Sequence, residues 1–276
     1  MQYNITLQVS VCPYLIMDML TLKPFFLFIM ASKTTTRKRK SDVPCVTTPV
    51  KVAVLIDGGF FLKRYNYLYN KKKTKKAADV ANDIYRLAHS HVGGENYLYR
   101  IFYYDCIPLD KRVHNPVSNK CINFATSELA KFKTELIEEL KKKRKVALRL
   151  GVLKCGNWQF RPSTVKDIIS GAKTSFDEND VFYEITQKGI DMKIGVDITT
   201  IALKKFADKI VLVSGDSDFV PAAKLARREG VDFVLDAMYA SHIDNSLYEH
   251  IDGLKSVQLY AIGDVAKSKK TKATKQ

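Results

Sequence analysis

The fold is decided by residues 52–59, which read VAVLIDGG. A second run of the same kind, VLVSGDSDF, occupies residues 211–219. Each begins as a continuous apolar run, which is typical of a parallel strand buried on both faces. Each then ends in a turn that contains an aspartate, Asp57 or Asp216. Because ligands of open α/β sheets bind outside the carboxyl ends of the strands, neighbouring strands would bring these carboxylates together.

Strand and helix patterns alternate from residue 51 to about residue 262. We expect strands at 51–56, 97–106, 146–155, 158–160, 209–214, 231–235 and 256–262, and helices at 60–69, 77–91, 127–144, 190–206, 219–229 and 241–250. We interpret residues 107–123 as a polar loop and 161–187 as a loop or short helix over the site, and we expect a hairpin at residues 156–157. The alternation predicts one α/β domain, residues 49–262, with a mainly parallel sheet.

The composition separates this domain from two basic ends. The formal net charge of the 276 residues is +16, which indicates a polyanionic partner such as nucleic acid, or lysine-rich tails that aid solubility. We expect residues 1–48 to be a disordered extension with a basic tail, in which 1–29 result from an upstream start assignment and Met30 is the true start. Residues 263–276 are predicted to be a disordered, lysine-rich tail.

Cysteine usage and the N-terminal pattern indicate a cytoplasmic protein with no membrane partner. The five cysteines form no C-x-x-C pair and have no histidine at zinc-like spacing, which favours free thiols. No basic region precedes the apolar N-terminal run, as a signal peptide would require. Asp18 and Lys23 interrupt that run, so it falls short of a membrane span.

Further carboxylates adjoin the two motifs. Residues 188–197 read KGIDMKIGVD, and Asp191 falls in the first turn of the predicted helix, where it also complements the helix dipole. Asp197 lies about 120° around the axis from Asp191, so we expect one to bind a metal directly and the other through water or a neighbouring group. Asp218 could be a ligand or a helix cap, and Asp105 could lie near the site.

Carboxylates without histidine or cysteine partners suit Mg²⁺ or Mn²⁺ rather than zinc. A divalent ion relieves their mutual repulsion and lowers the pKa of a bound water. A basic surface would hold the phosphates of a substrate, and the predicted nucleic-acid-binding residues are Lys63, Arg64, Lys188 and Lys193. Trp158, the only tryptophan, could stack on a base or pack in the core.

Other chemistries find little support in the sequence. It contains no G-x-x-x-x-G-K-[ST] and no G-x-G-x-x-G motif, which excludes the common nucleotide-cofactor sites. It also has no G-x-S-x-G elbow. An aspartyl-phosphate phosphatase could use Asp57 as its nucleophile. Such enzymes usually have a second aspartate two residues later, where this chain has Gly59.

The chain resembles the NYN domain family, in its LabA-like branch, which is related to the PIN-domain ribonucleases. The resemblance rests on IDGGFF at 56–61, KGID at 188–191 followed by Asp197, and SGDSDF at 214–219. The motifs occur in family order and cover about residues 51–250. The resemblance implies a three-layer α/β/α, PIN-like (Rossmannoid) domain and metal-dependent cleavage of RNA.

Carried over motif by motif, the resemblance implies that Asp57, Asp191, Asp197 and Asp216 are catalytic metal-site residues, with Asp218 as a further metal ligand. We therefore predict a Mg²⁺- or Mn²⁺-dependent endoribonuclease whose partner is single-stranded or structured RNA. The alternative is a non-catalytic nucleic-acid-binding regulatory protein that keeps the fold and the acidic pocket. A phosphatase of small phosphoesters is a third, weaker interpretation, and the oligomeric state, including a homodimer, stays open.

Overall fold

The computed structural model describes residues 48–71 and 74–259. The predictions for residues 1–47 and 260–276 lie outside this range, and the predicted domain boundaries at 49 and 262 stay a prediction. Within the described residues, a seven-stranded sheet has the order β6-β5-β2-β1-β7-β8-β9. The strands of this sheet are β1 (Lys51–Asp57), β2 (Tyr97–Cys106), β5 (Val146–Phe160), β6 (Val181–Lys188), β7 (Lys209–Val213), β8 (Asp232–Asp236) and β9 (Gly253–Leu254).

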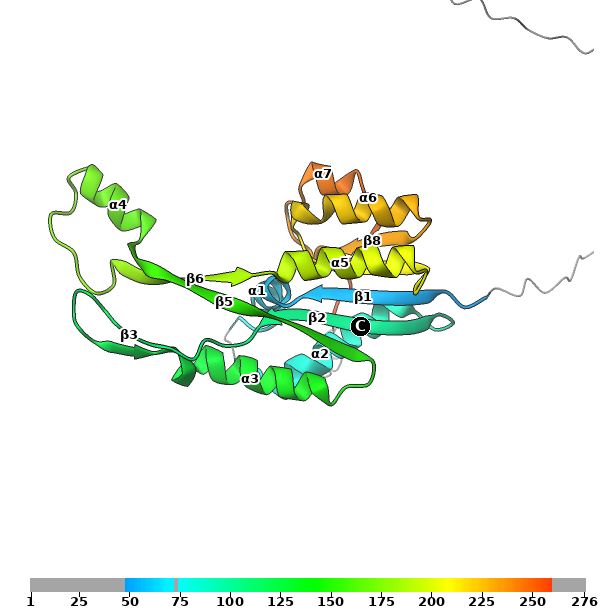
Figure 1. Cartoon of the computed structure of the whole chain (residues 1–276), viewed down its shortest axis with the longest axis horizontal. Helices are drawn as coiled ribbons and strands as arrows, with labels where there is room; N and C mark the ends of the chain where they lie inside the picture. The colour runs from blue at the N-terminus through cyan, green and yellow to red at the C-terminus, as the bar shows by residue number, and fades with distance from the viewer. Residues whose placement is uncertain (1–47, 72–73, 260–276) are drawn as a thin grey trace, which may run out of the picture. The chain divides into compact units, whose positions relative to one another are not determined.

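Helices cover both faces of this sheet (Figure 1). They are α1 (Gly58–Tyr69), α2 (Ala77–Val92), α3 (Glu128–Lys141), α4 (Pro162–Ile169), α5 (Ile190–Leu203), α6 (Val220–Arg228) and α7 (Asn245–Tyr248), with short 3-10 turns η1 (Phe124–Thr126) and η2 (Ser217–Phe219). Helices α1, α2 and α3 contribute to one hydrophobic core, and α5, α6 and α7 contribute to the other. Strands β5 and β6 pair antiparallel, whereas the other neighbours pair in parallel. The predicted three-layer, mainly parallel α/β/α fold is confirmed.

Strand β1 lies at the centre of the sheet, as its unbroken apolar run predicts. Its residues 52–56 are fully buried and alternate between the two cores. Parallel pairing with β2 and β7 places Asp57 beside Tyr104 of β2, while the last pair with β7 joins Ile56 to Val213. The aspartates that follow β1 and β7 therefore emerge at the same edge.

Strand β5 continues beyond the sheet and forms an arm with the segment that follows it. Residues 146–151 pair with β2, and residues from Val152 to Phe160 pair with β6. We call residues 152–188, which include α4, the arm; it projects past the carboxyl end of β1 (Figure 1). The predicted hairpin at 156–157 is wrong: a bulge interrupts the register there, and β5 runs on as one strand.

Three further segments differ from the sequence predictions. The expected loop 107–123 contains a small hairpin, β3 (Arg112–His114) and β4 (Cys121–Asn123). The expected helix at 241–250 is reduced to α7, and the last described strand, β9, precedes the range where we expected it. Among the residues that the structure describes, no helix has both the length and the apolar character needed to cross a bilayer.

Candidate active site

Asp57 links the central strand to the first helix. Its side chain caps α1 by accepting the N–H of Phe60, with N and Oδ1 3.1 Å apart. The helix begins close to β2, because a Cβ at Gly58 would lie 2.6 Å from the carbonyl oxygen of Tyr104. Burial raises the pKa of Asp57, the backbone N–H groups of Phe60 and Gly59 lower it, and the negative charges of nearby carboxylates raise it again.

Those nearby charges belong to Asp191 and Asp105. Asp191, in the first turn of α5, is exposed, and its own pKa is raised by partial burial and then by the charges of Asp216 and Asp218. The last two residues follow β7, where the carboxylate of Asp216 accepts the N–H of Asp218 at 3.0 Å. At the carboxyl edge, Asp191 is thus linked electrostatically to Asp57 on one side and to Asp216 and Asp218 on the other.

Asp197 has different surroundings, although it belongs to the same helix as Asp191. Its Oδ2 lies 2.9 Å from Nε of Arg149 and 2.8 Å from the hydroxyl of Tyr104. The guanidinium group balances the negative charge, and both donors engage the same oxygen. Asp197 is therefore tied to β5 and β2. Its charge is not among those that raise the pKa of Asp57 or of Asp191.

Asp105 is the penultimate residue of β2, the strand next to β1, and is almost fully buried. Its Oδ1 accepts from Nζ of Lys133 at 2.6 Å and from the N–H of Cys106 at 2.7 Å. Lys133, on α3, is a residue that sequence reasoning missed. The sequence offers no signal for it, since a lysine on an amphipathic helix is ordinary, and only the packing of α3 against the sheet reveals its partner.

The predicted nucleic-acid-binding residues fall into two groups. Lys63, Lys188 and Lys193 are exposed, and none of them forms an ion pair among the described residues. Arg64 instead donates to the backbone carbonyl oxygens of Met238, at 2.9 and 3.1 Å, and of Tyr239, at 2.5 Å. Both acceptor residues have positive φ angles, so Arg64 holds a strained turn, and its predicted contact with phosphate finds no support.

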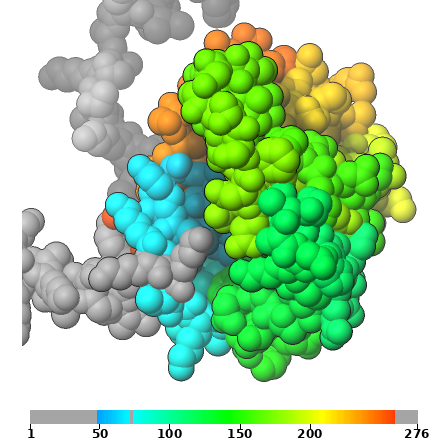
Figure 2. All heavy atoms as spheres, turned by 90° about the vertical axis from the view of Figure 1, so that its left-hand side faces the viewer, coloured from blue at the N-terminus to red at the C-terminus, as the bar shows by residue number. Residues whose placement is uncertain are grey.

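The arm begins directly at these carboxylates. A Cβ added to Gly59 would lie 3.4 Å from Oδ1 of Asp57 and 3.5 Å from Nε2 of Gln187, the penultimate residue of β6. Figure 2 looks onto this end, where a hollow separates the blue and cyan segments around α1 from the green arm and α3. The carboxyl edge of the sheet and the root of the arm therefore share one opening.

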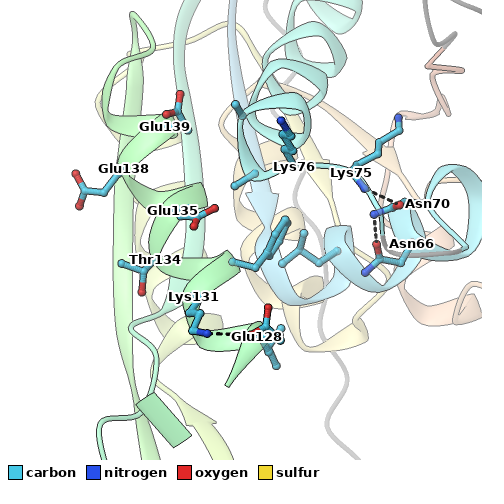
Figure 3. Close-up of a pocket in the computed structure, with 15 residues that line it drawn as sticks. Asn66, Asn70, Lys75, Lys76, Glu128, Lys131, Thr134, Glu135, Glu138 and Glu139 are labelled. Atoms are coloured by element: carbon cyan, nitrogen blue, oxygen red, sulfur yellow. Dashed lines mark hydrogen bonds and ion pairs between the residues drawn. The ribbon is translucent and has the colours of Figure 1, made fainter. Parts of the chain in front are cut away.

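A groove of about 830 Å³ lies between α3 and the connection from α1 to α2 (Figure 3). Asn66, Asn70 and Lys75 lie on one side, with Glu128 and Glu135 on the other. None of the predicted aspartates lines it. Its size alone therefore gives no reason to place the chemistry there.

The donor chemistry at the carboxyl edge fits a magnesium or manganese ion. All candidate ligands are carboxylates. Burial, and after it the charges of neighbouring carboxylates, raise the pKa values of Asp57 and Asp191, and a cation would relieve that repulsion. Within residues 48–71 and 74–259, no three acidic, histidine or cysteine side chains stand close enough to enclose an ion. Mg²⁺ usually keeps several waters and uses one or two carboxylates, so a closed cage is not required.

Comparisons with known proteins support the family resemblance. Residues 133–253 match the family model of the NYN domain. The matched range contains Asp191, Asp197, Asp216 and Asp218, whereas Asp57 precedes it. The comparison with curated proteins gave no match. A solved structure of a protein of unknown function from Vibrio parahaemolyticus aligns with a TM-score of 0.40 and 13% identity, covering 76% of this chain and 94% of that chain.

Proposed function

We propose, because residues 133–253 match the model of the NYN domain, a family of PIN-like nucleases, that the protein is a metal-dependent endoribonuclease. This match supports hydrolysis of nucleic acid in general. The choice of RNA, the need for Mg²⁺ or Mn²⁺ and the cleavage of internal bonds belong to the proposal. Its strongest support is the coupling of the carboxylates that follow β1 and β7 with Asp191, at the start of α5.

In this proposal, Asp57, Asp191 and Asp216 hold the metal, with Asp218 as an additional ligand. Asp197, which is paired with Arg149, acts indirectly by fixing the position of α5. A bound divalent ion would neutralise phosphate charge and supply a water of lowered pKa.

The protein's own groups prepare this site for a phosphodiester. The backbone N–H groups of Gly59 and Phe60 stabilise the ionised form of Asp57 against the cost of its burial. Lys63, Lys188 and Lys193 are exposed cations that can contact the phosphates on either side of the bond to be cut. They supply positive charge that the acidic cluster by itself lacks.

The test is cleavage of end-labelled single-stranded and structured RNA with Mn²⁺, Mg²⁺ or EDTA. We expect metal-dependent internal cutting by the wild type and a loss of about a hundredfold or more in Asp216→Asn, because the substitution removes a charged ligand. Asp232→Asn is the matched control, since Asp232 is an exposed aspartate at the opposite, amino end of the neighbouring strand β8. Equal rates in the two variants would contradict the assignment of Asp216.

A non-catalytic nucleic-acid-binding protein is the second candidate. One observation favours it: Asp197, which the family resemblance implies as a metal-site residue, is paired with Arg149 and accepts a hydrogen bond from the hydroxyl of Tyr104. The same experiment separates the two functions. RNA binding without cutting under any metal would favour the binding protein, and cutting that EDTA stops would favour the enzyme.

A further inference from the structure

The arm presents one of its faces toward the carboxylates. Side chains alternate across a strand, so Gln187, Ile185 and Tyr183 of β6 share a face. The register places Trp158 of β5 opposite Tyr183 on that face. Because Gln187 lies against Gly59, beside Asp57, the same face leads from the site outward along the arm (Figure 1).

Aromatic rings cluster on this face. The rings of Trp158 and Tyr183 meet edge to face with centroids 5.6 Å apart, and the ring of Phe124 lies 5.8 Å from that of Tyr183. Nζ of Lys111 lies 2.7 Å from the hydroxyl oxygen of Tyr183 and 5.2 Å from the centre of its ring. All three rings are only half-buried, so part of each aromatic surface is open to a ligand.

The charges around these rings favour a polyanion. The cations at the root of the arm are exposed and have no carboxylate partner among the described residues; they are Lys111, Arg112, Lys154 and Lys188. Apart from the aspartates of the candidate site, the acidic residues near these cations are Asp110 and Glu184. Farther out, Lys120 pairs with Glu178 and Lys173 with Asp180, whereas the exposed Arg161 and Lys166 have no carboxylate partner among the described residues. Cations without a carboxylate partner therefore occur along the arm, including the part that adjoins the aspartates.

We propose that the face carrying Phe124, Trp158 and Tyr183 binds a single-stranded part of the nucleic-acid substrate by stacking on its bases and leads that strand to the carboxylates. This inference rests on the proposed function, and it adds the strandedness of the substrate. Unpaired bases expose the flat surfaces that half-buried aromatic rings can stack on, whereas a duplex hides them. The four residue steps from Tyr183 to Gln187 span about 13 Å, so a strand must be several nucleotides long to contact both regions.

Trp158 provides a direct readout, because it is the only tryptophan of the chain. In EDTA, where metal-dependent cleavage is prevented, titration with a long single-stranded RNA should quench its fluorescence. A matched DNA strand tests the sugar, and a fully paired RNA duplex should quench much less. We expect Tyr183→Leu to weaken binding of the single strand about tenfold, as loss of one base-stacking contact does.

Phe182→Leu is the control variant for this test. Phe182 is the adjacent, half-buried residue of β6 on the opposite face, where its ring lies 5.9 Å from the guanidinium carbon of Arg161. It should bind the single strand as the wild type does. Tyr183→Phe, which keeps the ring and loses the hydroxyl contact with Lys111, should stay within about threefold of the wild type.

Equal affinities of the Tyr183→Leu and Phe182→Leu variants would overturn the proposal and leave the rings as packing within the arm. Equally strong quenching by the duplex would also overturn it. Circular dichroism of each variant checks that the protein still folds. If Tyr183→Leu does not fold, Tyr183→Phe remains available for the binding test. Because binding is measured without metal, a failure of the stacking surface is distinguishable from a failure of the nuclease assignment.

Discussion

The central strand β1 and the arm are built from the same kind of backbone but bury very different amounts of it. Residues 52–56 of β1 are fully inaccessible, whereas most residues of the arm are exposed or half-buried. A strand buried on both faces cannot shift, because its neighbours are closely packed. We place the proposed chemistry where the rigid strands end, and the arm offers contact surface beyond them.

The largest expected effect is on the stability of the buried sheet. Leu212→Ala, in β7, should lower the free energy of unfolding by about 2–5 kcal/mol, because Leu212 is fully buried. Ile185→Ala, in the arm, should cost about 1 kcal/mol or less, since Ile185 is only half-buried. Urea denaturation of both variants measures this difference, and equal losses would mean that the arm is as tightly packed as the sheet.

A smaller effect, of opposite sign, is expected at the edge of the rigid region. The pKa of Asp57 is raised above its ordinary value of 3.8, first by burial and then by neighbouring carboxylates. Ionisation of Asp57 therefore opposes folding at neutral pH, and this penalty disappears at a pH below 3.8, where the carboxyl is protonated in both states. Asp57→Asn should be more stable than the wild type at neutral pH, and asparagine still caps the helix.

Thermal melts in EDTA at neutral and acidic pH measure this prediction. The gain of Asp57→Asn should shrink as the pH falls, and Mg²⁺ should stabilise the wild type more than the variant. Asp232→Asn, at the amino end of β8, serves again as the control for a surface aspartate. A loss of stability in Asp57→Asn at neutral pH would show that the carboxylate makes a net favourable contact.

The smallest effect is expected at the ion pair between Arg149 and Asp197. Both side chains are partly exposed, at 40% and 20%, so Arg149→Gln should cost about 0.5 kcal/mol of stability. On cleavage, Asp197→Asn should have far less effect than Asp191→Asn, because only Asp191 is coupled to the other carboxylates. Equally low cleavage rates for Asp197→Asn and Asp191→Asn would instead indicate that both residues contact the metal directly.

Sequence patterns predicted the rigid region well and the arm poorly. The unbroken apolar runs at 52–56 and 210–213 match fully buried parallel strands, because burial on both faces leaves a strong signal. In the arm, β6 reads VFYEITQK, whose mixed polarity reflects a strand that is open on one side. The glycine at 156 made residues 156–157 resemble a turn. In the structure this glycine belongs to the bulge, where a Cβ would lie 2.3 Å from the carboxylate of Glu184.

The same contrast holds for the candidate site. Motif order predicted that Asp57, Asp191 and Asp216 belong together, and strand ends at one edge explain their coupling. It could not distinguish Asp197, whose partner Arg149 is distant in sequence, or assign Arg64 to the turn at Met238. These outcomes depend on side-chain directions and on long-range packing, which local patterns do not encode.

The position of β1 between two strands that are encoded later also has a consequence during protein synthesis. Asp57 leaves the ribosome early, but its neighbour β7 and the following Asp216 belong to the last third of the chain. At the usual pace of translation, roughly 10–30 s separate the two residues. A growing chain therefore lacks its full set of candidate metal-binding carboxylates until β7 and Asp216 have emerged.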